Sequence, residues 1–547
     1  MAETVNIARL MEQQAADAPL RRAVVFPEGR DRNGNVAWTH LTFQQLNRLT
    51  DAYAYGLTDA GVRRGDRVSL LVKPCLEFIP LVFAIFKIGA IPVLIDPGMG
   101  RKGFLRCIQH IKPRVLIGEP IAQVIRTVFR SAFASVEVSI TNGPSTWFWG
   151  GRTLEQCAQH SDEPFPTAPT QGSDEAAILF TSGSTGPAKG VTYTHRIFDA
   201  QTRYIQQLYG IEPGEVDLAC FPLFGLFSMA MGMTVVIPDM DPTKPAQAEP
   251  KKLIEAIEAH GCTSAFGSPA IWKNMAVYAR DQGIKLPSMR RILMAGAPIP
   301  VWMHEAFQQI FSDGAELHTP YGATESLPVA SIGTNEVLSD TAARTREGAG
   351  TCVGHPAPGI TVRVIGISDD PIATWDSQRC LPDGQIGEIC VSGPQVTPEY
   401  KDEPEKTAAA KIYEGDTIWH RMGDLGYIDK LGRIWFCGRK SHRVTLADGS
   451  LKFPVPCEGI FNEHPDVYRT ALVGVGGEAV LVVELEPKSV SVSRQKVTTE
   501  LLELGAKNPI TVDVKRILFH DGFPVDVRHN AKIHRLQLAA WASSRVS

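Results

Sequence analysis

The sequence lacks any apolar stretch long enough to cross a membrane, and its cysteines form no pattern typical of a metal centre. No run of about 18 apolar residues occurs, so no membrane-spanning helix is expected. The ten cysteines are scattered without a Cys-x-x-Cys pair, which argues against a zinc framework and against a disulfide scaffold. The N-terminal segment carries acidic side chains and has no apolar core of the kind found in signal peptides. We therefore expect a cytoplasmic protein whose thiols remain reduced.

An excess of positive charge is also missing. The 547 residues carry a net charge of -4, and 44% of them are hydrophobic and 21% charged, as in ordinary globular proteins. Broad binding of nucleic acid requires a basic surface, so nucleic acid is not an expected partner. The length corresponds to roughly three or four units of ordinary domain size.

The commonest phosphate-binding motif is absent, although one segment has the composition of a phosphate-binding loop. "FTSGSTGPAKGVTYTH", residues 180–195, combines three glycines, several hydroxyl side chains and one lysine. A Walker A loop requires Gly-x-x-x-x-Gly-Lys-Ser/Thr. Counted from Gly183, the second glycine is replaced by Ala188, and Lys189 is followed by Gly190. Because a strand entering such a loop presents N–H and O–H donors to an anion, the segment still predicts phosphate binding.

Alternating strand and helix patterns in the first 300 residues predict an α/β fold. "DRVSLLVK" and "IPVLID" are typical of short buried strands, and the apolar segment "CLEFIPLVFAIFKIG" between them is typical of a buried helix. From about Gly348, short strands with tight turns indicate a β-rich part, and after Gly438 a polar stretch precedes a small α+β pattern. We predict an N-terminal domain of residues 1–437 and a C-terminal domain of residues 438–547.

Three further segments follow the loop in a fixed order: "YGATES" at 321–326, "MGDLGYID" at 422–429 and "GRK" at 438–440. Together the four segments closely resemble the motifs of the adenylate-forming superfamily, which includes acyl-CoA synthetases, luciferases and peptide-synthetase adenylation domains. The resemblance covers essentially the whole chain. It implies a large N-terminal domain of α/β layers plus a β-barrel, with a small mobile α+β C-terminal domain. It also implies a reaction in which a carboxylate attacks the α-phosphate of ATP, pyrophosphate leaves and an acyl-adenylate remains.

The resemblance assigns nucleotide-binding roles to individual residues. The loop that handles the β- and γ-phosphates of ATP would consist of Thr181, Ser182, Gly183, Ser184, Thr185, Gly186 and Lys189. The adenine side of the site would be formed by Gly296, Ala297, Pro298, Tyr321, which stacks on the base, and Gly322 of the same motif. Asp424 would accept hydrogen bonds from both ribose hydroxyls, and Arg439 would lie on the ribose or phosphate side.

Three residues receive catalytic roles from the same resemblance. Thr324 would contact the α-phosphate and Glu325 would hold Mg²⁺, an ion that prefers oxygen ligands and is often bound by one carboxylate plus substrate phosphates. The C-terminal lysine of the superfamily usually stands in Pro-x₄₋₅-Gly-Lys-x-x-Arg. Here Lys532 and Arg535 match that pattern, with Ala531 in place of the glycine. Lys532 would offset the charge that builds up on the α-phosphate in the transition state.

Three other stretches are most similar to one branch of the superfamily, the β-lactone synthetases of bacterial long-chain olefin biosynthesis. They are "PGMGRKG", "FPLFGLFSMAMGMTVVIPDMDPTKPA" and "VPCEGIFNEHPDV". In that branch a long-chain 2-alkyl-3-hydroxy acid is adenylated. Its own 3-hydroxyl then attacks the acyl carbon and releases AMP, closing a β-lactone without CoA. The resemblance implies the same substrate here and allows for assembly with other enzymes of the olefin pathway.

Two departures from the superfamily pattern leave the second step open. Gly225 stands where many relatives have an aromatic residue or histidine, and Ser441 stands in the hinge where Asp or Lys is usual. The apolar residues around Gly225 are consistent with a tunnel for alkyl chains and equally with ordinary core. His195 and His318 are candidates for activating the 3-hydroxyl, but both are also consistent with packing. The alternatives are a long-chain acyl-CoA ligase or fatty acyl-AMP ligase and, outside catalysis, an acyl or nucleotide sensor.

Overall fold

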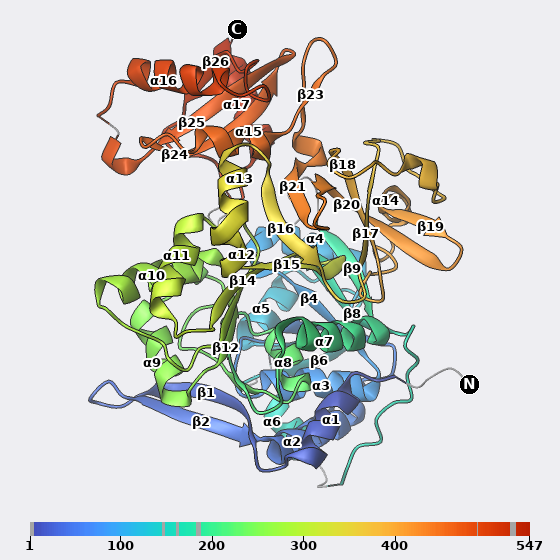
Figure 1. Ribbon diagram of the computed structural model, residues 1–547. Helices are drawn as coiled ribbons and strands as arrows, with labels where there is room; N and C mark the ends of the chain where they lie inside the picture. The colour runs from blue at the N-terminus through green and yellow to red at the C-terminus, as the bar shows by residue number, and fades with distance from the viewer. Residues whose placement is uncertain are drawn as a thin grey trace.

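The computed structural model describes residues 5–144, 148–159, 163–181, 188–489, 491–525 and 532–546. Two sheets and the helices around them make up most of the molecule (Figure 1). The first sheet has the spatial order β7-β6-β5-β3-β4-β8-β9 and is parallel except for the hairpin of β8 and β9. Its strands are β3 (Arg67–Leu71), β4 (Ile91–Ile95), β5 (Val115–Gly118), β6 (Val138–Thr141), β7 (Arg152–Thr153), β8 (Glu175–Thr181) and β9 (Lys189–Thr194).

The second sheet joins a parallel part to an antiparallel part. Its order is β17-β18-β20-β21-β16-β15-β14-β13-β12-β10-β11-β1-β2, with β19 paired to β20. The parallel part with its edge hairpin contains β1 (Arg22–Arg30), β2 (Val36–Thr42), β10 (Val216–Ala219), β11 (Thr234–Val236), β12 (Ser264–Gly267), β13 (Arg291–Met294) and β14 (Glu316–Ala323). The antiparallel part contains β15 (Ser326–Gly333), β16 (Thr351–Pro356), β17 (Thr361–Ile365), β18 (Gly387–Ser392), β19 (Lys411–Glu414), β20 (Thr417–Ile428) and β21 (Ile434–Arg439). The β-rich part expected from Gly348 is thus an extension of the large sheet.

The helices cover these sheets and separate them. They are α1 (Ala8–Asp17), α2 (Phe43–Asp59), α3 (Phe78–Ile88), α4 (Gly100–Ile111), α5 (Pro120–Val128), α6 (Leu154–Cys157), α7 (His195–Tyr209), α8 (Gly225–Ala230), α9 (Pro250–His260), α10 (Pro269–Asp281), α11 (Val301–Ile310), α12 (Thr334–Glu336), α13 (Ala342–Arg346) and α14 (Pro404–Ala410). Between α12 and α13 the chain forms one π-helical turn, Val337–Thr341.

One core lies between the two sheets. Every residue of α3 is buried, as its continuous apolar sequence predicts, and the helix ends at Gly89, whose φ of 75° suits glycine. Phe83 of α3 belongs to a buried cluster that also contains Val68 of β3, Leu46 of α2 and Val235 of β11. A second cluster packs α9, α10 and α11 against strands β10 to β14. Burial on both faces explains why strands such as β4 and β5 are apolar throughout.

The strands after β21 form two separate sheets: a short one, β22-β23, and a three-stranded one, β24-β25-β26, which has its own buried cluster. This part packs through α15 on α13 and β21, at the top of Figure 1. It consists of β22 (Val444–Thr445), β23 (Leu451–Lys452), α15 (Pro454–Phe461), β24 (Val467–Val475), β25 (Glu478–Leu485), α16 (Arg494–Ala506), β26 (Arg516–Phe519) and α17 (Arg535–Val546).

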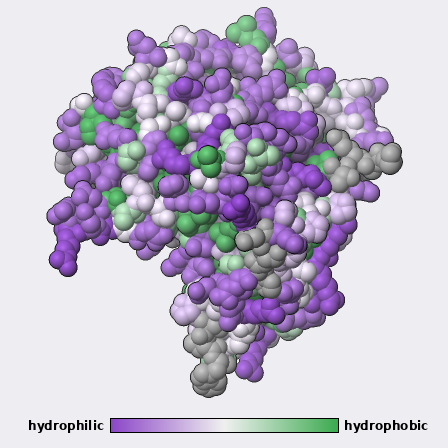
Figure 2. All heavy atoms as spheres, turned by 90° about the horizontal axis from the view of Figure 1, so that it is seen from below, coloured by the Kyte–Doolittle hydropathy of each residue, from purple (hydrophilic) through white to green (hydrophobic). Residues whose placement is uncertain are grey.

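Polar side chains dominate the face of the molecule that is seen from below, where hydrophobic residues appear singly or in small groups (Figure 2). Within the described ranges, none of the helices combines the length and the apolar character needed to cross a membrane.

Candidate active site

The residues expected to bind a nucleotide come from strands far apart in the sequence. Gly296, with a φ of 101°, follows the end of β13, and Tyr321 lies near the end of β14. Asp424 and Arg439 are cross-strand neighbours on β20 and β21. The carboxyl ends of parallel strands and the β20–β21 hairpin therefore meet here, a common place for a ligand site in open α/β sheets.

Asp424 lies at the centre of a buried polar group. Its Oδ2 accepts a hydrogen bond from the Tyr321 hydroxyl at 2.6 Å, and its Oδ1 accepts one from Arg439 Nη1 at 2.7 Å. Burial raises the pKa of Asp424, and the Arg439 guanidinium opposes that shift. Because each carboxylate oxygen has a further acceptor position, both oxygens can still accept hydrogen bonds from a sugar. Gly423 has a φ of 67°, which explains the glycine that precedes the aspartate.

Two ionic groups hold the β20–β21 hairpin that presents Asp424 and Arg439. On one side Glu388, almost fully buried, accepts two hydrogen bonds from Arg421 of β20 and pairs with Lys440, which follows β21, at 3.1 Å. On the other side Asp429, at the turn, accepts hydrogen bonds from Arg433 Nε at 2.8 Å and from Trp435 Nε1 at 2.9 Å.

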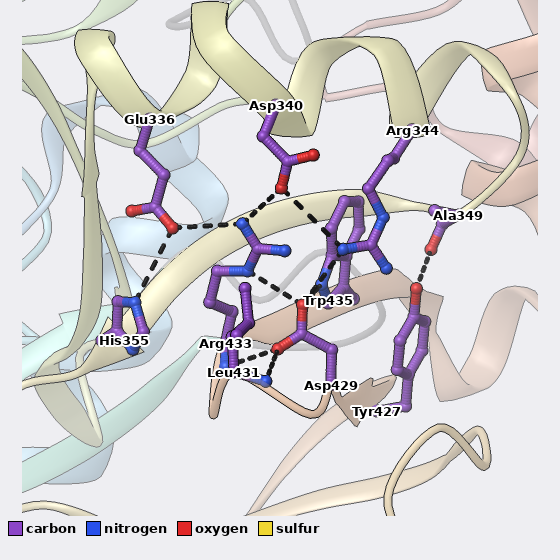
Figure 3. Close-up of polar contacts among 10 residues, drawn as sticks. All are labelled: Glu336, Asp340, Arg344, Ala349, His355, Tyr427, Asp429, Leu431, Arg433 and Trp435. Atoms are coloured by element: carbon purple, nitrogen blue, oxygen red, sulfur yellow. Dashed lines mark hydrogen bonds and ion pairs between the residues drawn. The ribbon is translucent and has the colours of Figure 1, made fainter.

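Figure 3 shows how the turn of this hairpin is joined to the helical segment above it. Arg433 also reaches Asp340 at 2.6 Å and Glu336 at 3.3 Å, and Arg344 pairs with Asp429 at 3.3 Å. The guanidinium of Arg344 lies 4.4 Å from the Trp435 ring centre. These contacts fix the position of the hairpin relative to α12 and α13.

Glu325 lies in the turn between β14 and β15 and accepts hydrogen bonds from two residues. The Tyr400 hydroxyl donates to Glu325 Oε1 at 2.5 Å. Thr397 donates to the Glu325 carbonyl from its main-chain N at 2.9 Å and from its Oγ1 at 3.1 Å. The carbonyl of the neighbouring Thr324 accepts a hydrogen bond from the Tyr193 hydroxyl at 2.6 Å. The Thr324–Glu325 turn is therefore positioned by partly buried hydrogen bonds.

Lys189 joins the same group through Tyr400. Its Nζ lies 4.4 Å from the centre of the Tyr400 ring, a cation–π arrangement. Burial lowers the pKa of Lys189, and the Glu325 carboxylate opposes that shift. The structure thus brings the lysine of the glycine-rich loop close to Glu325. Tyr400 was missed in the sequence because it stands between the motifs with no recognisable spacing.

Some of the predicted residues border the parts of the chain that the structure describes or lie outside them. Thr181 pairs with Lys189 in the β8–β9 ladder, so the predicted loop is the connection of a hairpin. Five predicted loop residues lie outside the described residues: Ser182, Gly183, Ser184, Thr185 and Gly186. Ala297, Pro298 and Gly322 lie beside Gly296 and Tyr321 in the chain.

Lys532 is exposed and belongs to the C-terminal part, three residues before Arg535. Arg535 forms a bidentate ion pair with the buried Glu458 of α15, with Nη2 at 2.8 Å from Oε2. Burial raises the pKa of Glu458, and Arg535 opposes that shift. This pair anchors the segment that carries Lys532 to the body of the C-terminal part.

Three positions had open alternatives in the sequence: His195, His318 and Gly225. His195 is buried, its Nδ1 accepts a hydrogen bond from the Ile7 main-chain N at 3.2 Å, and burial lowers its pKa to about 4. His318 is half-buried, and its ring is tilted against that of Tyr209 with ring centres 5.3 Å apart. A Cβ on Gly225 would lie 3.0 Å from Val235 Cγ1, so α8 packs closely on β11 at this point. These contacts favour packing over a direct chemical role for the two histidines and over an open tunnel at Gly225.

Comparison with known proteins supports one family. Residues 11–401 match the model of the AMP-binding enzymes. An olefin beta-lactone synthetase from Xanthomonas campestris pv. campestris is 43% identical, over 100% of this chain and 99% of the relative. Another from Stenotrophomonas maltophilia is 44% identical, with the same coverage.

Among solved structures, ATP-bound MatB from Rhodopseudomonas palustris has a TM-score of 0.78 at 21% identity, over 99% of this chain and 100% of that one. The amide bond synthetase McbA from Marinactinospora thermotolerans also reaches 0.78, at 22% identity, over 98% and 99% of the two chains. At this identity the two structures show the shared fold. The α/β fold and the superfamily inferred from the four motifs are therefore confirmed: the chain belongs to the family of AMP-binding enzymes, in the group that contains the olefin β-lactone synthetases.

Proposed function

We propose that the protein is an ATP-dependent β-lactone synthetase acting on a long-chain 2-alkyl-3-hydroxyalkanoic acid. The observation that carries the proposal is full-length similarity to two olefin beta-lactone synthetases at 43% and 44% identity. The buried groups around Asp424 and Glu325 support it because they gather, from distant segments, residue types suited to a ribose and to phosphates. An intact set of this kind argues against a sensor that has lost its catalytic residues.

In the first step one carboxylate oxygen of the substrate attacks the α-phosphorus of ATP. The bond from the α-phosphorus to the bridging oxygen breaks, and pyrophosphate leaves. We assign the ribose to Asp424, the adenine to residues 296–298 and Tyr321, and the phosphates to Lys189 with the 181–186 loop. Thr324, Arg439 and Lys532 are assigned to the α-phosphate side, where fixed donors and cations stabilise developing negative charge.

The residues at Glu325 fit Mg²⁺ as the metal ion. Within the described parts of the chain, no group of three or more His, Cys, Asp or Glu side chains is arranged to hold a metal. An ion at Glu325 would therefore take its other ligands from phosphate oxygens and water, as Mg²⁺ commonly does. Tyr400 occupies Glu325 Oε1 with one hydrogen bond and leaves lone pairs of the carboxylate for an ion. Bound there, Mg²⁺ would neutralise charge on the phosphates.

In the second step the 3-hydroxyl oxygen of the acyl-adenylate attacks its own carbonyl carbon. The hydroxyl proton is released, the bond from the carbonyl carbon to the phosphate oxygen breaks, and AMP leaves with a four-membered lactone. The nucleophile is tethered, so its high effective molarity offsets part of the ring strain. No CoA takes part, which is consistent with the departure at Ser441 from the usual hinge sequence.

Three predictions about organisation accompany this function. We propose that residues 1–437 and 438–547 are separate domains and that the second is mobile, supported by the separate sheet β24-β25-β26 and by Lys532 within it. We also propose a cytoplasmic location, supported by ten free cysteines. Assembly with other olefin-pathway enzymes remains a prediction from the resemblance.

The decisive experiment compares a 2-alkyl-3-hydroxy acid with the same acid lacking the 3-hydroxyl. Both should support ATP–pyrophosphate exchange, because both have the carboxylate. Only the hydroxy acid should give continuous AMP release without CoA, with a β-lactone identified by NMR. Rapid turnover of the deoxy acid on addition of CoA, with a thioester as product, would instead identify a long-chain acyl-CoA ligase.

A further inference from the structure

Lys411 is a buried lysine with an unusual environment. It begins β19, only 1% of its surface is exposed, and its Nζ donates to the Thr397 carbonyl at 2.5 Å, with Thr397 Oγ1 at 3.5 Å. In the described chain no carboxylate oxygen lies within ion-pair distance of this ammonium group. The other deeply buried lysine, Lys87, pairs with Asp51 at 2.5 Å and with Glu12 at 3.0 Å. Burying an ammonium group without a counter-ion is costly, so Lys411 calls for a functional explanation.

The contacts of Lys411 lead directly to Glu325. Thr397, which accepts from Lys411, donates both its main-chain N–H and its hydroxyl to the Glu325 carbonyl. Three residues further on, Tyr400 donates to the Glu325 carboxylate. A β-bridge between Val396 and Ser326 joins the same two segments. The segment 396–400 therefore contacts both the main chain and the side chain of Glu325. Lys411 contacts the same segment through its hydrogen bond to Thr397.

Lys411 lies among buried side chains and not on an exposed surface. Its cross-strand neighbour His420 is also buried, and His420 Nδ1 has no partner in the described structure. Burial, followed by the nearby Lys411, lowers the pKa of His420 well below its usual range, so the imidazole is neutral. Burial lowers the pKa of Lys411 to about 7, and the Glu325 carboxylate opposes that shift. Lys411 is thus close enough to Glu325 to act on its charge, although it is itself almost fully buried.

We propose that Lys411 is a positioning residue for the adenylation step. Through Thr397 and the segment that carries Tyr400, it fixes the orientation in which Glu325 meets the metal ion on the phosphates of ATP. This inference rests on the proposed function, since it requires Glu325 to act at the phosphates. Residues that orient a metal ligand commonly affect metal affinity or activity by about 10- to 100-fold.

The test measures binding of the metal–nucleotide complex apart from catalysis. Mn²⁺ with ATP is titrated into the full-length protein and followed by electron paramagnetic resonance, while metal-free AMP is titrated by calorimetry. Lys411→Met should weaken Mn²⁺–ATP binding about tenfold and change the Kd of AMP less than about twofold. Tyr400→Phe, which removes only the hydroxyl, should give a shift in the same direction. Glu325→Gln shows how far the Mn²⁺–ATP affinity falls when the proposed metal ligand itself is lost.

Matched controls separate positioning from general destabilisation. Tyr209→Phe likewise removes one tyrosine hydroxyl, which donates to Ser331 Oγ at 3.1 Å and not to Glu325, and should leave Mn²⁺–ATP binding unchanged. Wild-type Mn²⁺–ATP affinity in folded Lys411→Met would overturn the proposal, whatever Tyr400→Phe gives. If Lys411→Met does not fold, Lys411→Gln, which keeps an N–H donor but shortens the side chain, takes its place and is judged by the same result. Failure of the proposed function would appear separately, as absence of lactone from the wild-type enzyme.

Discussion

At the scale of single residues, Asp424 offers the most direct test of nucleotide recognition. Its carboxylate is buried and already oriented by Tyr321 and Arg439. We expect Asp424→Ala to weaken ATP binding about ten- to a hundred-fold, because a hydrogen bond to a charged group contributes roughly 1.5–3 kcal/mol. Calorimetry gives the Kd, and circular dichroism checks the fold. Asp424→Asn keeps an acceptor for Tyr321, so its Kd for ATP should lie between those of the wild type and Asp424→Ala. An unaltered Kd in Asp424→Ala would contradict the assignment to ribose.

Lys532 is expected to act on the rate and not on nucleotide binding. It is exposed and stands three residues before Arg535, which pairs with Glu458, and the superfamily pattern assigns it to the α-phosphate. Lys532→Ala should reduce ATP–pyrophosphate exchange by about 10²–10³-fold, the usual cost of removing one transition-state contact. The Kd of ATP should stay within about twofold. Lys507→Ala, at another exposed lysine of the same part, is the control and should retain full exchange.

What the sequence could predict at this scale depended on motifs. Tyr321, Asp424 and Arg439 stand in recognisable segments, and the structure brings the three together. Tyr400 and Lys411 stand in no motif, and their link to Glu325 depends on a bridge between segments about 70 residues apart, which no local pattern reports. The roles assigned to the individual site residues remain predictions.

At the scale of elements, the β20–β21 hairpin depends on the buried ion pairs at its turn. Arg433 is 2% exposed and contacts the carboxylates of Asp429, Asp340 and Glu336. Arg433→Met should destabilise the protein by about 3–5 kcal/mol, because it leaves the buried Asp429 without its main cation. Arg344→Met removes a more exposed partner of Asp429 and should cost about 1 kcal/mol or less. Urea unfolding followed by circular dichroism measures both, and equal losses would contradict a special role for Arg433.

The elements that the sequence predicted well are those with strong local patterns. The buried helix α3 and strands β3 and β4 follow from continuous apolar runs. The hairpin of β1 and β2 was not predicted, because β1 is placed by pairing with β11, where Val24 lies beside Val235 more than 200 residues away. The same limit applies to the π-helical turn at Val337–Thr341, whose contacts with Arg433 arise only in the folded chain.

At the scale of the whole molecule, buried histidines make stability depend on pH. Burial lowers the pKa of His195 and of His304 to about 4, and both imidazoles are almost fully buried. Between pH 6.5 and 4 the unfolded chain binds protons that the folded chain does not, so acidification favours unfolding. Each imidazole lowers the free energy of unfolding by about 2 kcal/mol when the pH falls from 6.5 to 5. Burial raises the pKa of Asp217 to about 6, which acts in the opposite direction below that pH. For these three groups alone, the loss in the free energy of unfolding is about 2–3 kcal/mol at pH 5. Burial also lowers the pKa of His260 and of His442 to about 4, which adds to the loss on acidification.

Replacing one imidazole tests this balance. In His195→Asn the amide oxygen can still accept the hydrogen bond from the Ile7 main-chain N, but the side chain no longer ionises. The variant should therefore lose less stability than the wild type when the pH falls from 7 to 5, by about 2 kcal/mol in the free energy of unfolding from urea titrations. His195→Asn should also retain lactone formation, because His195 is held by the N-terminal segment inside the core. Loss of the second step with intact ATP–pyrophosphate exchange would restore His195 as the group that activates the 3-hydroxyl.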